Sequence, residues 1–211
     1  MNSMKSILIS FFCLTFTLLK LHSQDTLRFM SYNLLNFPDG ANYFCGASNQ
    51  VIPQREDSLS IVLEYLKPTV LGVCELQTDS GANLILNESL NTWASGKYNQ
   101  SDWTPVSGGL NTHLYYDTNK VSLVAQYVVY VTSRDIDHYI LETKLHQNRI
   151  HVFMSHFKAG NSQQNIDIRE TQAIELMDYI DFYCSGQSYM LMGDLNFYTG
   201  NEPGFQTLIN N

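Results

Sequence analysis

The sequence predicts an α/β protein built as a layered sandwich, with two β-sheets and helices packed outside them. Segments in which apolar and polar residues alternate recur along the chain and are typical of strands, several of them in hairpin order. Segments with apolar residues at helical spacing lie between some of these strands. A chain of 211 residues, 44% of them hydrophobic and 12% aromatic, is long enough to bury the core of one such domain.

The first half of the chain is predicted to contain two strands and two helices. Alternation beginning at Leu27 predicts the first strand. Helical spacing from Leu59 to Leu66 predicts the first helix, which Pro68 ends. The predicted elements are a strand over residues 27–33, a Gly/Asn-rich loop over 39–50, a helix over 55–66, a strand over 70–75 and a helix over 81–93.

Strands dominate the second half. The turn Asp117-Thr118-Asn119-Lys120 separates two predicted strands, and Gln147-Asn148 closes a predicted hairpin. A long amphipathic helix follows the hairpin. The predicted elements are strands over residues 113–116, 121–131, 139–145 and 149–157, a helix over 166–183, a strand over 188–194 and a last helix over 202–209.

Residues 1–24 have the pattern of a signal peptide. Lys5 gives a short positive segment, and residues 7–19 form a mostly apolar run. This run is shorter than the roughly 20 residues that span a bilayer, and Lys20 interrupts it. We therefore expect export to a secreted or periplasmic location without stable membrane insertion, and a single domain over residues 25–211.

The charge balance bears on the substrate. The chain has 12 Lys and Arg against 20 Asp and Glu, a formal net charge of -8. Proteins that hold duplex DNA mainly by charge carry a basic surface, so tight non-specific binding to DNA is not supported. An acidic protein can still act on a phosphate ester, because a bound divalent cation supplies local positive charge.

The cysteine count limits disulfide pairing. Cys13 lies in the signal segment, which leaves Cys45, Cys74 and Cys184. At least one of these thiols is free unless a partner chain takes part. Cys74 lies in an apolar run and is predicted to be a small buried hydrophobe. A Cys45–Cys184 disulfide is compatible with export and stays open. No CxxC pair or Cys/His cluster in the sequence suggests a zinc site.

Four predicted apolar strands end in polar residues. These residues are Asn33, Glu75, His156 and Asp194, with Asn196 two residues further on. A carboxylate or imidazole at the end of a core strand costs free energy unless it is hydrogen-bonded, paired or metal-bound. If the strand ends converge, these side chains form one polar pocket. Carboxylate oxygens suit Mg²⁺ or Ca²⁺, and the histidine can donate a proton or a hydrogen bond.

Four short segments carry a family resemblance. They are Ser31-Tyr32-Asn33, Leu71-Gly72-Val73-Cys74-Glu75, Ser155-His156-Phe157-Lys158 and Gly193-Asp194-Leu195-Asn196. In order and spacing they resemble the successive motifs of the endonuclease/exonuclease/phosphatase (DNase I-like) superfamily. Tyr115-Tyr116-Asp117 and Arg134-Asp135 are similar further positions. The resemblance covers about residues 26–210, and its specificity comes from the ordered set.

The resemblance implies a four-layer α/β/β/α sandwich and a phosphoester hydrolase, nuclease-like on a phosphodiester. It implies a divalent metal, Mg²⁺ with Mn²⁺ or Ca²⁺ as alternatives, which Glu75 binds and Asn33 helps to hold. His156, Asp194 and Asn196 are the implied catalytic residues. Arg134 and Asn196 are implied contacts to the substrate phosphate. Nucleic acid is the first expected substrate, lipid or sugar phosphates are alternatives, and a monomer is expected.

One family motif has no counterpart. Family members end in a further strand with an Asp-His pair, and this sequence stops at Asn211 before such a strand. Asp137-His138 lies in a predicted loop, in the wrong order, and is not expected to substitute. We therefore expect a C-terminally truncated chain of low activity, with the last strand or strands missing. A phospholipid or sphingolipid phosphodiesterase and a non-catalytic binding protein that keeps the fold stay open as alternatives.

Overall fold

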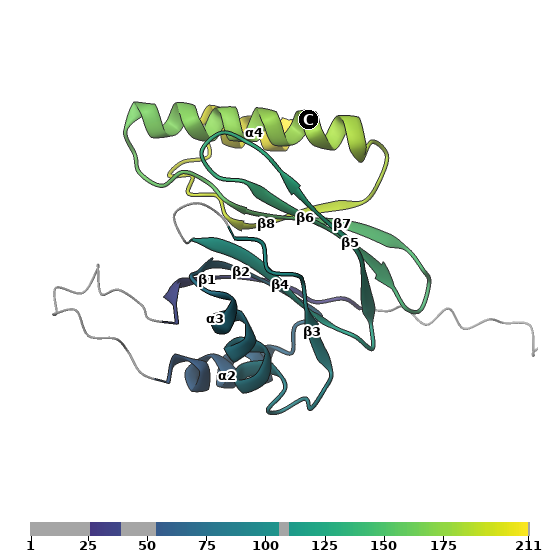
Figure 1. The fold of residues 1–211 in the computed structure, drawn as a ribbon. Coiled ribbons are helices and arrows are strands. Elements are labelled where there is room, and N and C mark those ends of the chain that lie inside the picture. The colour runs from purple at the N-terminus through teal and green to yellow at the C-terminus, as the bar shows by residue number, and fades with distance from the viewer. Residues whose placement is uncertain (1–25, 39–53, 106–109, 211) are drawn as a thin grey trace, which may run out of the picture.

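The computed structural model describes residues 26–38, 54–105 and 110–210, which form four stacked layers (Figure 1). Two four-stranded sheets lie face to face in the middle, and helices cover their two outer faces. The predicted α/β/β/α sandwich is confirmed. The predicted signal peptide and the Gly/Asn-rich loop lie outside the described residues. Within the described ranges, no helix combines the length and apolar character needed to cross a bilayer.

The first sheet has the strand order β1-β2-β4-β3. Its strands are β1 (Phe29–Phe37), β2 (Val70–Leu76), β3 (Tyr98–Gln100) and β4 (Asn111–Asp117). β1 runs parallel to β2, and β4 runs antiparallel to β2. β2 and β4 lie between neighbours and are buried along almost their whole length. This burial on both faces explains why β2 is a continuous apolar run in the sequence.

The second sheet has the strand order β5-β6-β7-β8. Its strands are β5 (Val121–Val129), β6 (Ile136–Thr143), β7 (Arg149–His156) and β8 (Tyr189–Asp194). β5, β6 and β7 form an antiparallel meander, so the predicted hairpin around Gln147-Asn148 is confirmed. β8 runs parallel to β7, because a helix carries the chain back across the sheet before β8 begins.

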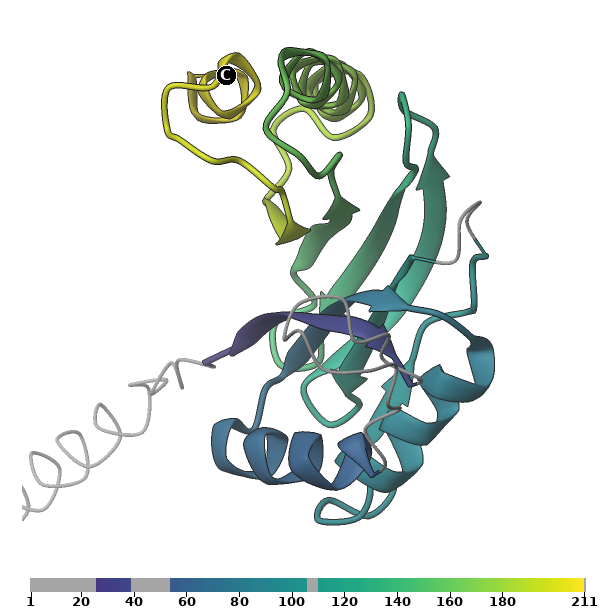
Figure 2. The same ribbon diagram turned by 90° about the vertical axis from the view of Figure 1, so that its left-hand side faces the viewer.

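The helices form the two outer layers. They are α2 (Arg55–Leu66), α3 (Asp79–Leu84) and the π-helix η1 (Ile85–Leu90) on the first sheet, and α4 (Gln163–Tyr183) and α5 (Pro203–Asn210) on the second. Ser162 begins α4, because its side chain accepts a hydrogen bond from the backbone N–H of Asn165. The side view shows α4 and α5 next to each other above the second sheet (Figure 2).

Three apolar cores lie between the four layers. Leu63 and Tyr115 belong to the core between α2 and the first sheet. Val152 and Met154 belong to the core between the two sheets, whereas Phe153 on the same strand belongs to the core under α4. Successive side chains of a strand point to opposite faces. Strand β7 therefore contributes to two separate interiors, and this determines where its two histidines lie.

Three local features of the structure were not predicted from the sequence. The helix predicted over residues 81–93 begins at Asp79 and passes from α3 into the π-helix, which ends at Leu90. Strand β3 was not predicted, because three residues are too few to show a period. The two strands around the turn at Asp117 do not pair with each other. β4 belongs to the first sheet and β5 to the second, so this turn passes the chain between the sheets.

Candidate functional site

The carboxyl ends of four strands meet at one edge of the sandwich. The parallel pair β1 and β2 ends beside the parallel pair β7 and β8, and the backbone N–H of Gly193 donates to Ser31 Oγ at 3.0 Å. The residues brought together are Asn33, Glu75, His156 and Asp194, which we call the strand-end cluster. The convergence expected from the sequence is thus observed, while the chemical role of each residue stays a prediction.

Asn33 joins the two carboxylates of the cluster. Its Nδ2 donates to Glu75 Oε1 at 3.0 Å and to Asp194 Oδ2 at 2.9 Å. Its Oδ1 accepts the backbone N–H of Leu35 at 2.9 Å, which fixes the orientation of the amide. Asn33 therefore presents nitrogen to the carboxylates and orients them. Direct coordination of a metal by its oxygen would require the amide to turn over and lose the bond from Leu35.

The backbone at the end of β1 and β2 is irregular. Glu75 has a φ of 60°, and Leu35 and Asn36 have φ values of 48° and 56°, all in the left-handed region that non-glycine residues rarely adopt. The pairing of β2 shifts register on both sides at this point. Such irregularities turn a side chain away from its ordinary strand direction and are concentrated at functional sites. Here they turn Glu75 toward the cluster.

Gly193 allows β8 to approach β7 closely. Its φ is 124°, and a Cβ at this position would lie 1.9 Å from the backbone oxygen of Ser155. A backbone neighbour cannot move aside, so only glycine fits here. The resulting register places Asp194 directly opposite His156. The glycine of the Gly193-Asp194 segment is therefore needed for the geometry of the cluster.

His156 is buried and neutral. Burial, and then the charge of Arg134, lower the pKa of His156, while the carboxylates of Glu75 and Asp194 oppose this shift. Its Nε2 lies 3.7 Å from Glu75 Oε1, which is too far for a hydrogen bond. Its Nδ1 is buried without a hydrogen-bond partner. The ring is therefore uncommitted and can donate a hydrogen bond to a bound phosphate.

Arg134 brings a positive charge to the cluster. Its guanidinium donates to the backbone oxygens of His156 and Phe157, at 3.3 and 3.2 Å. Burial lowers the pKa of Arg134, and the carboxylates of Glu75 and Asp194 oppose that shift, as expected for a cation close to both. Arg134 therefore occupies a place that suits its predicted contact with the substrate phosphate.

Asn196 fixes the carboxylate of Asp194. Its backbone N–H donates to Asp194 Oδ1 at 3.1 Å, and its Nδ2 donates to the backbone oxygen of Phe157 at 3.1 Å. The left-handed φ of 53° at Asn196 permits this tight turn. Asp194 is thus held through both oxygens, by Asn196 and by Asn33. The second Nδ2 hydrogen of Asn196 is the donor that its predicted contact with the substrate phosphate would use.

Two hollows flank the strand ends. One, of about 450 Å³, is lined by side chains that include Tyr32, Leu35 and Arg55. The other, of about 320 Å³, is lined by Asp194, Asn196, Phe197 and Tyr198. Tyr32 and Tyr198 are 42% and 58% exposed. Each hollow therefore includes one exposed aromatic ring and one residue of the strand-end cluster, Asn33 in the first and Asp194 in the second.

The donor set of the strand-end cluster fits a hard divalent cation. Mg²⁺ in proteins is usually held by one or two carboxylates and keeps positions for water and phosphate oxygens. Glu75 and Asp194 share a single donor, so their oxygens lie within two hydrogen-bond lengths of each other. Both carboxylates are turned toward the same amide nitrogen of Asn33, and one ion could bind between them if their oxygens came together. These are the residues that would hold Mg²⁺.

Asp137-His138 does not lie in a loop, so this expectation was wrong. Pairing with β5 and β7 extends β6 back to Ile136, before the predicted start at residue 139. Asp137 accepts a hydrogen bond from Thr112 on β4, whereas Nδ1 of His138 lies 3.1 Å from Tyr179 Oη on α4. The two side chains point to opposite faces of the strand, so they cannot act as an Asp-His pair.

The sequence contains no CxxC pair or Cys/His cluster that suggests a zinc site, but the folded chain does contain a Cys/His cluster. The structure brings His138, His151 and Cys184 together, with ligand atoms within 4.8 Å of one another. Cys184 is a buried free thiol, and Cys45, its suggested disulfide partner, lies outside the described residues. Cys74 is fully buried as predicted, and burial raises its pKa to about 12. No sequence spacing signals the new cluster.

Arg169 is a further residue that the motifs do not reveal. It is completely buried, and its guanidinium binds Glu202 Oε2 through Nε at 2.9 Å and through Nη2 at 2.7 Å. Its Nη1 donates to the backbone oxygens of Lys158 and Gly160, at 2.8 and 2.7 Å. Arg169 therefore fixes the segment that follows His156 and attaches α5 to α4.

Comparison with known proteins identifies the fold. No known family profile matches the sequence, and a search of curated proteins finds no significant relative. Solved structures do match. An endonuclease/exonuclease/phosphatase family protein from Bacteroides thetaiotaomicron has a TM-score of 0.63 at 15% identity, over 87% of this chain and 66% of that one. A mannosyl-6-phosphatase from Bacteroides thetaiotaomicron VPI-5482 has a TM-score of 0.63 at 15% identity, over 88% and 70%.

A third match is D. rerio TDP2 complexed with a single-strand DNA product. Its TM-score is 0.59 at 14% identity, over 82% of this chain and 62% of that one. The chain thus spans roughly two thirds of the length of the solved proteins it matches. It has the fold of the endonuclease/exonuclease/phosphatase superfamily, and the resemblance found in its motifs is confirmed at the level of fold.

Proposed function

From this fold and the strand-end cluster, we propose that the chain is an exported, divalent-metal-dependent phosphodiesterase with a nuclease-like reaction. The observation that carries the proposal is the bridge from Asn33 to the carboxylates of Glu75 and Asp194. Proteins with the same fold include a mannosyl-6-phosphatase and a protein complexed with a DNA product. Both act on phosphate-containing molecules, which supports a phosphoester as the substrate.

We propose a role for each side chain of the cluster. Asp194, held through both oxygens, orients the attacking water and accepts its proton. His156 is neutral and donates a hydrogen bond to the scissile phosphate. Arg134 and the free Nδ2 hydrogen of Asn196 contact the phosphate oxygens. Donors fixed before the reaction stabilise developing charge without reorganising, which is the largest effect available to such a site.

Mg²⁺ is the proposed ion, with Mn²⁺ and Ca²⁺ as alternatives, and Glu75 and Asp194 would hold it. When bound, the cation supplies positive charge next to the phosphate oxygens where negative charge develops. Asn33 keeps the two carboxylates at a common distance. This assignment also explains how a chain with a net charge of -8 could act on an anionic substrate.

Single-stranded nucleic acid is the first proposed substrate. The exposed rings of Tyr32 and Tyr198 offer faces on which bases can stack, and stacking is tolerant of sequence. The acidic composition weighs against duplex DNA, whose binding depends on basic side chains. Phospholipids, sphingolipids and sugar phosphates are the alternative substrates, and a non-catalytic binding protein is the alternative function.

A substrate panel tests the proposal. The longest open reading frame that contains this sequence should be expressed without residues 1–24 and assayed on single-stranded DNA, RNA, duplex DNA, phospholipid, sphingolipid and sugar phosphate. Each assay is run with Mg²⁺, Mn²⁺ or Ca²⁺ and again with a chelator. We expect cleavage of single strands that the chelator abolishes. A lack of metal-dependent hydrolysis of every substrate would support the non-catalytic alternative.

Export is a separate part of the proposal. Residues 1–24 have the charge and length pattern of a signal peptide. Fractionation of the native host, followed by N-terminal sequencing of the mature protein, should find a chain outside the cytoplasm that begins near residue 25. A chain that keeps Met1 and stays in the cytoplasm would contradict export and leave the catalytic proposal untouched. Gel filtration of the same sample tests the expected monomer.

A further inference from the structure

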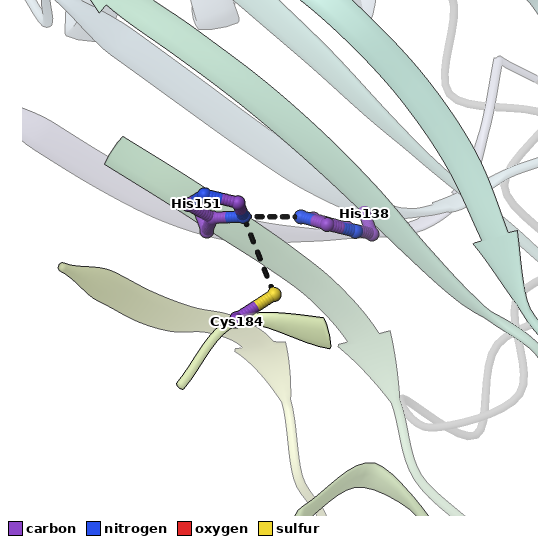
Figure 3. Close-up of side chains that lie close together, drawn as sticks. All are labelled: His138, His151 and Cys184. Atoms are coloured by element: carbon purple, nitrogen blue, oxygen red, sulfur yellow. Dashed lines mark hydrogen bonds between the residues drawn. The ribbon is translucent and has the colours of Figure 1, made fainter. Parts of the chain in front are cut away.

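A second polar cluster lies on the other face of the second sheet, under the end of α4. Nε2 of His138 is 2.8 Å from Nδ1 of His151, and Sγ of Cys184 is 3.4 Å from the same nitrogen (Figure 3). We call His138, His151 and Cys184 the buried cluster. In the part of the chain that the structure describes, no other group of three His, Cys, Asp or Glu residues brings its ligand atoms within 4.8 Å.

Three elements that are distant in sequence build this cluster. His138 and His151 lie on the neighbouring strands β6 and β7, and Cys184 is the residue that ends α4. Strand alternation places His151 on the face opposite to Val152, which packs between the sheets. The three side chains are 2%, 7% and 1% exposed. The buried cluster therefore belongs to the interface between sheet and helix, apart from the strand-end cluster.

The hydrogen bonds alone do not account for the arrangement. Nδ1 of His151 faces both Nε2 of His138 and Sγ of Cys184. A ring nitrogen has either one lone pair or one hydrogen, according to the tautomer. In either tautomer it can satisfy only one of its two neighbours fully. Three donor atoms that converge in this way could hold a cation.

The donor types select the kind of cation. Two imidazole nitrogens and a cysteine sulfur suit Zn²⁺ and not the hard ions proposed for the strand-end cluster. With Zn–N distances of about 2.0 Å and Zn–S distances of about 2.3 Å, tetrahedral neighbours lie about 3.3 to 3.6 Å apart. The observed separations are 2.8 and 3.4 Å. The contact between the two histidines would have to widen, and the third pair, Nε2 of His138 and Sγ of Cys184, lies within 4.8 Å.

We propose that the buried cluster is a zinc site, with Nε2 of His138, Nδ1 of His151 and Sγ of Cys184 as ligands and water in the fourth position. On binding, the thiol of Cys184 releases its proton to solvent as the sulfur–zinc bond forms, while both imidazoles bind as neutral ligands. No oxidant or reductant is needed. The inference does not depend on the proposed hydrolase activity, because the two clusters lie on opposite faces of the sheet.

Burial affects the protonation of the side chains in the buried cluster. Burial, and then the neighbouring His151, lower the pKa of His138 to about 4, so this ring is neutral near neutral pH. Burial also raises the pKa of Cys184, which makes its thiolate costly in the absence of a cation. A bound divalent ion removes that cost, because the thiolate is then stabilised by a direct bond. The site would therefore bind metal and lose a proton together.

Tyr179 is the positioning residue of the site. Its Oη lies 3.1 Å from Nδ1 of His138, the ring nitrogen that does not face the other two ligands. A partner on the outer nitrogen fixes the ring and leaves Nε2 free to bind metal. The backbone N–H of His151 donates to the backbone oxygen of Ser188, in the exposed segment 185–188 that follows Cys184. Zinc would fasten the end of α4 to the second sheet.

Cobalt titration tests the proposal. The metal-free protein is titrated with Co²⁺ in a large excess of Mg²⁺, which occupies oxygen-donor sites. We expect one ion per chain, with thiolate-to-cobalt charge-transfer absorption that Zn²⁺ abolishes by displacement. Cys184→Ser and His151→Gln should remove that absorption and weaken affinity at least about tenfold. Cys74→Ala and His146→Gln are the matched controls, a thiol and a histidine outside the cluster, and should bind as the parent does.

A second variant separates the site from general loss of structure. Tyr179→Phe keeps all three ligands and should weaken zinc binding about 10- to 100-fold while retaining the charge-transfer absorption. Zinc should also raise the melting temperature of the parent and not that of Cys184→Ser. Absorption that is absent from the parent, or that survives in Cys184→Ser, would overturn the proposal. If Cys184→Ser does not fold, His151→Gln and Tyr179→Phe decide the outcome.

Discussion

Two polar clusters share strand β7, and they differ in almost every other respect. His156, at the end of the strand, joins a carboxylate-rich group at the edge of the sandwich. His151, near the start of the strand, joins a second histidine and a thiol under α4. The first group offers mainly oxygen, and the second offers nitrogen and sulfur. Hard cations suit the first and zinc suits the second.

The difference shows how one strand can serve two chemistries. His151 and His156 are five positions apart along the strand, and an odd spacing directs two side chains to opposite faces. One face of β7 meets the other sheet, and the other face meets α4. Each histidine therefore takes its chemistry from a different neighbouring layer. Changes at one cluster should leave the other intact, and this independence can be tested.

Asp194→Asn should have the largest effect on the strand-end cluster. The amide keeps the shape of the side chain and loses the carboxylate that orients and deprotonates water. We expect kcat to fall about 10²- to 10⁴-fold with a smaller change in KM. Steady-state kinetics on the preferred substrate give the result, and Asp178→Asn, at an exposed position of α4, is the matched control. Equal kinetics in both variants would remove Asp194 from the mechanism.

Gly193→Ala tests whether the approach of β8 to β7 builds the strand-end cluster. The new Cβ would lie 1.9 Å from a backbone oxygen, at a φ of 124°. We expect a loss of roughly 3 kcal/mol or more in the free energy of unfolding, measured by denaturant titration. Gly96→Ala also has a positive φ but meets nothing within 4 Å, so it should cost about 1 kcal/mol. Similar losses in the two variants would contradict the steric argument.

Glu75→Gln should weaken the dependence on Mg²⁺ and leave zinc binding unchanged. The variant removes one of the two charges that would hold the ion. A charge-assisted contact contributes about 1.5 to 3 kcal/mol, so the Mg²⁺ concentration at half-maximal activity should rise roughly 10- to 100-fold. Metal titration of activity provides the measurement, and Glu64→Gln on the exposed face of α2 is the control. A shift in cobalt affinity would show that the clusters are coupled.

His113 gives a reference for a buried histidine in neither cluster. Burial lowers the pKa of His113 to about 4, below the ordinary histidine value of 6.5. Between these values the unfolded chain binds a proton that the folded chain does not, so stability falls as pH decreases. From about pH 7.5 to about pH 5.5 this contribution should be about 1 kcal/mol. Denaturant titrations at both pH values give the free energy of unfolding. Its change between the two pH values should be about 1 kcal/mol smaller in His113→Asn than in the parent.

Much of the strand-end cluster could be predicted before the structure. Asn33, Glu75, His156 and Asp194 each end an apolar strand, and parallel neighbours bring such ends to one edge of a sheet. The details could not be predicted. Two such details are the left-handed backbone at Glu75 and the amide orientation of Asn33, whose nitrogen and not its oxygen faces the carboxylates. Both depend on contacts between β1, β2 and β8. Such contacts join residues far apart in the chain, and no local period encodes them.

The buried cluster had no signal in the sequence at all. His138, His151 and Cys184 occupy a strand, the next strand and the end of a helix, and none belongs to a recognised spacing. They meet because α4 packs across the outer face of the second sheet. A similar limit affected Asp137 and His138, whose strand was predicted to begin only at residue 139. Pairing with β5 and β7, not local composition, extends β6 back to Ile136.

The sequence by itself determined most of the strands and helices, a layered sandwich of two sheets and the polar residues at the strand ends, since apolar period and turn residues are local properties. The four-layer class came from the family resemblance of the motifs. Tertiary structure decided which sheet receives β4 and which receives β5, and which faces of β6 and β7 meet α4. The physical reason is that burial stabilises many different pairings of apolar faces. Only one combination of these pairings lets the whole chain pack together.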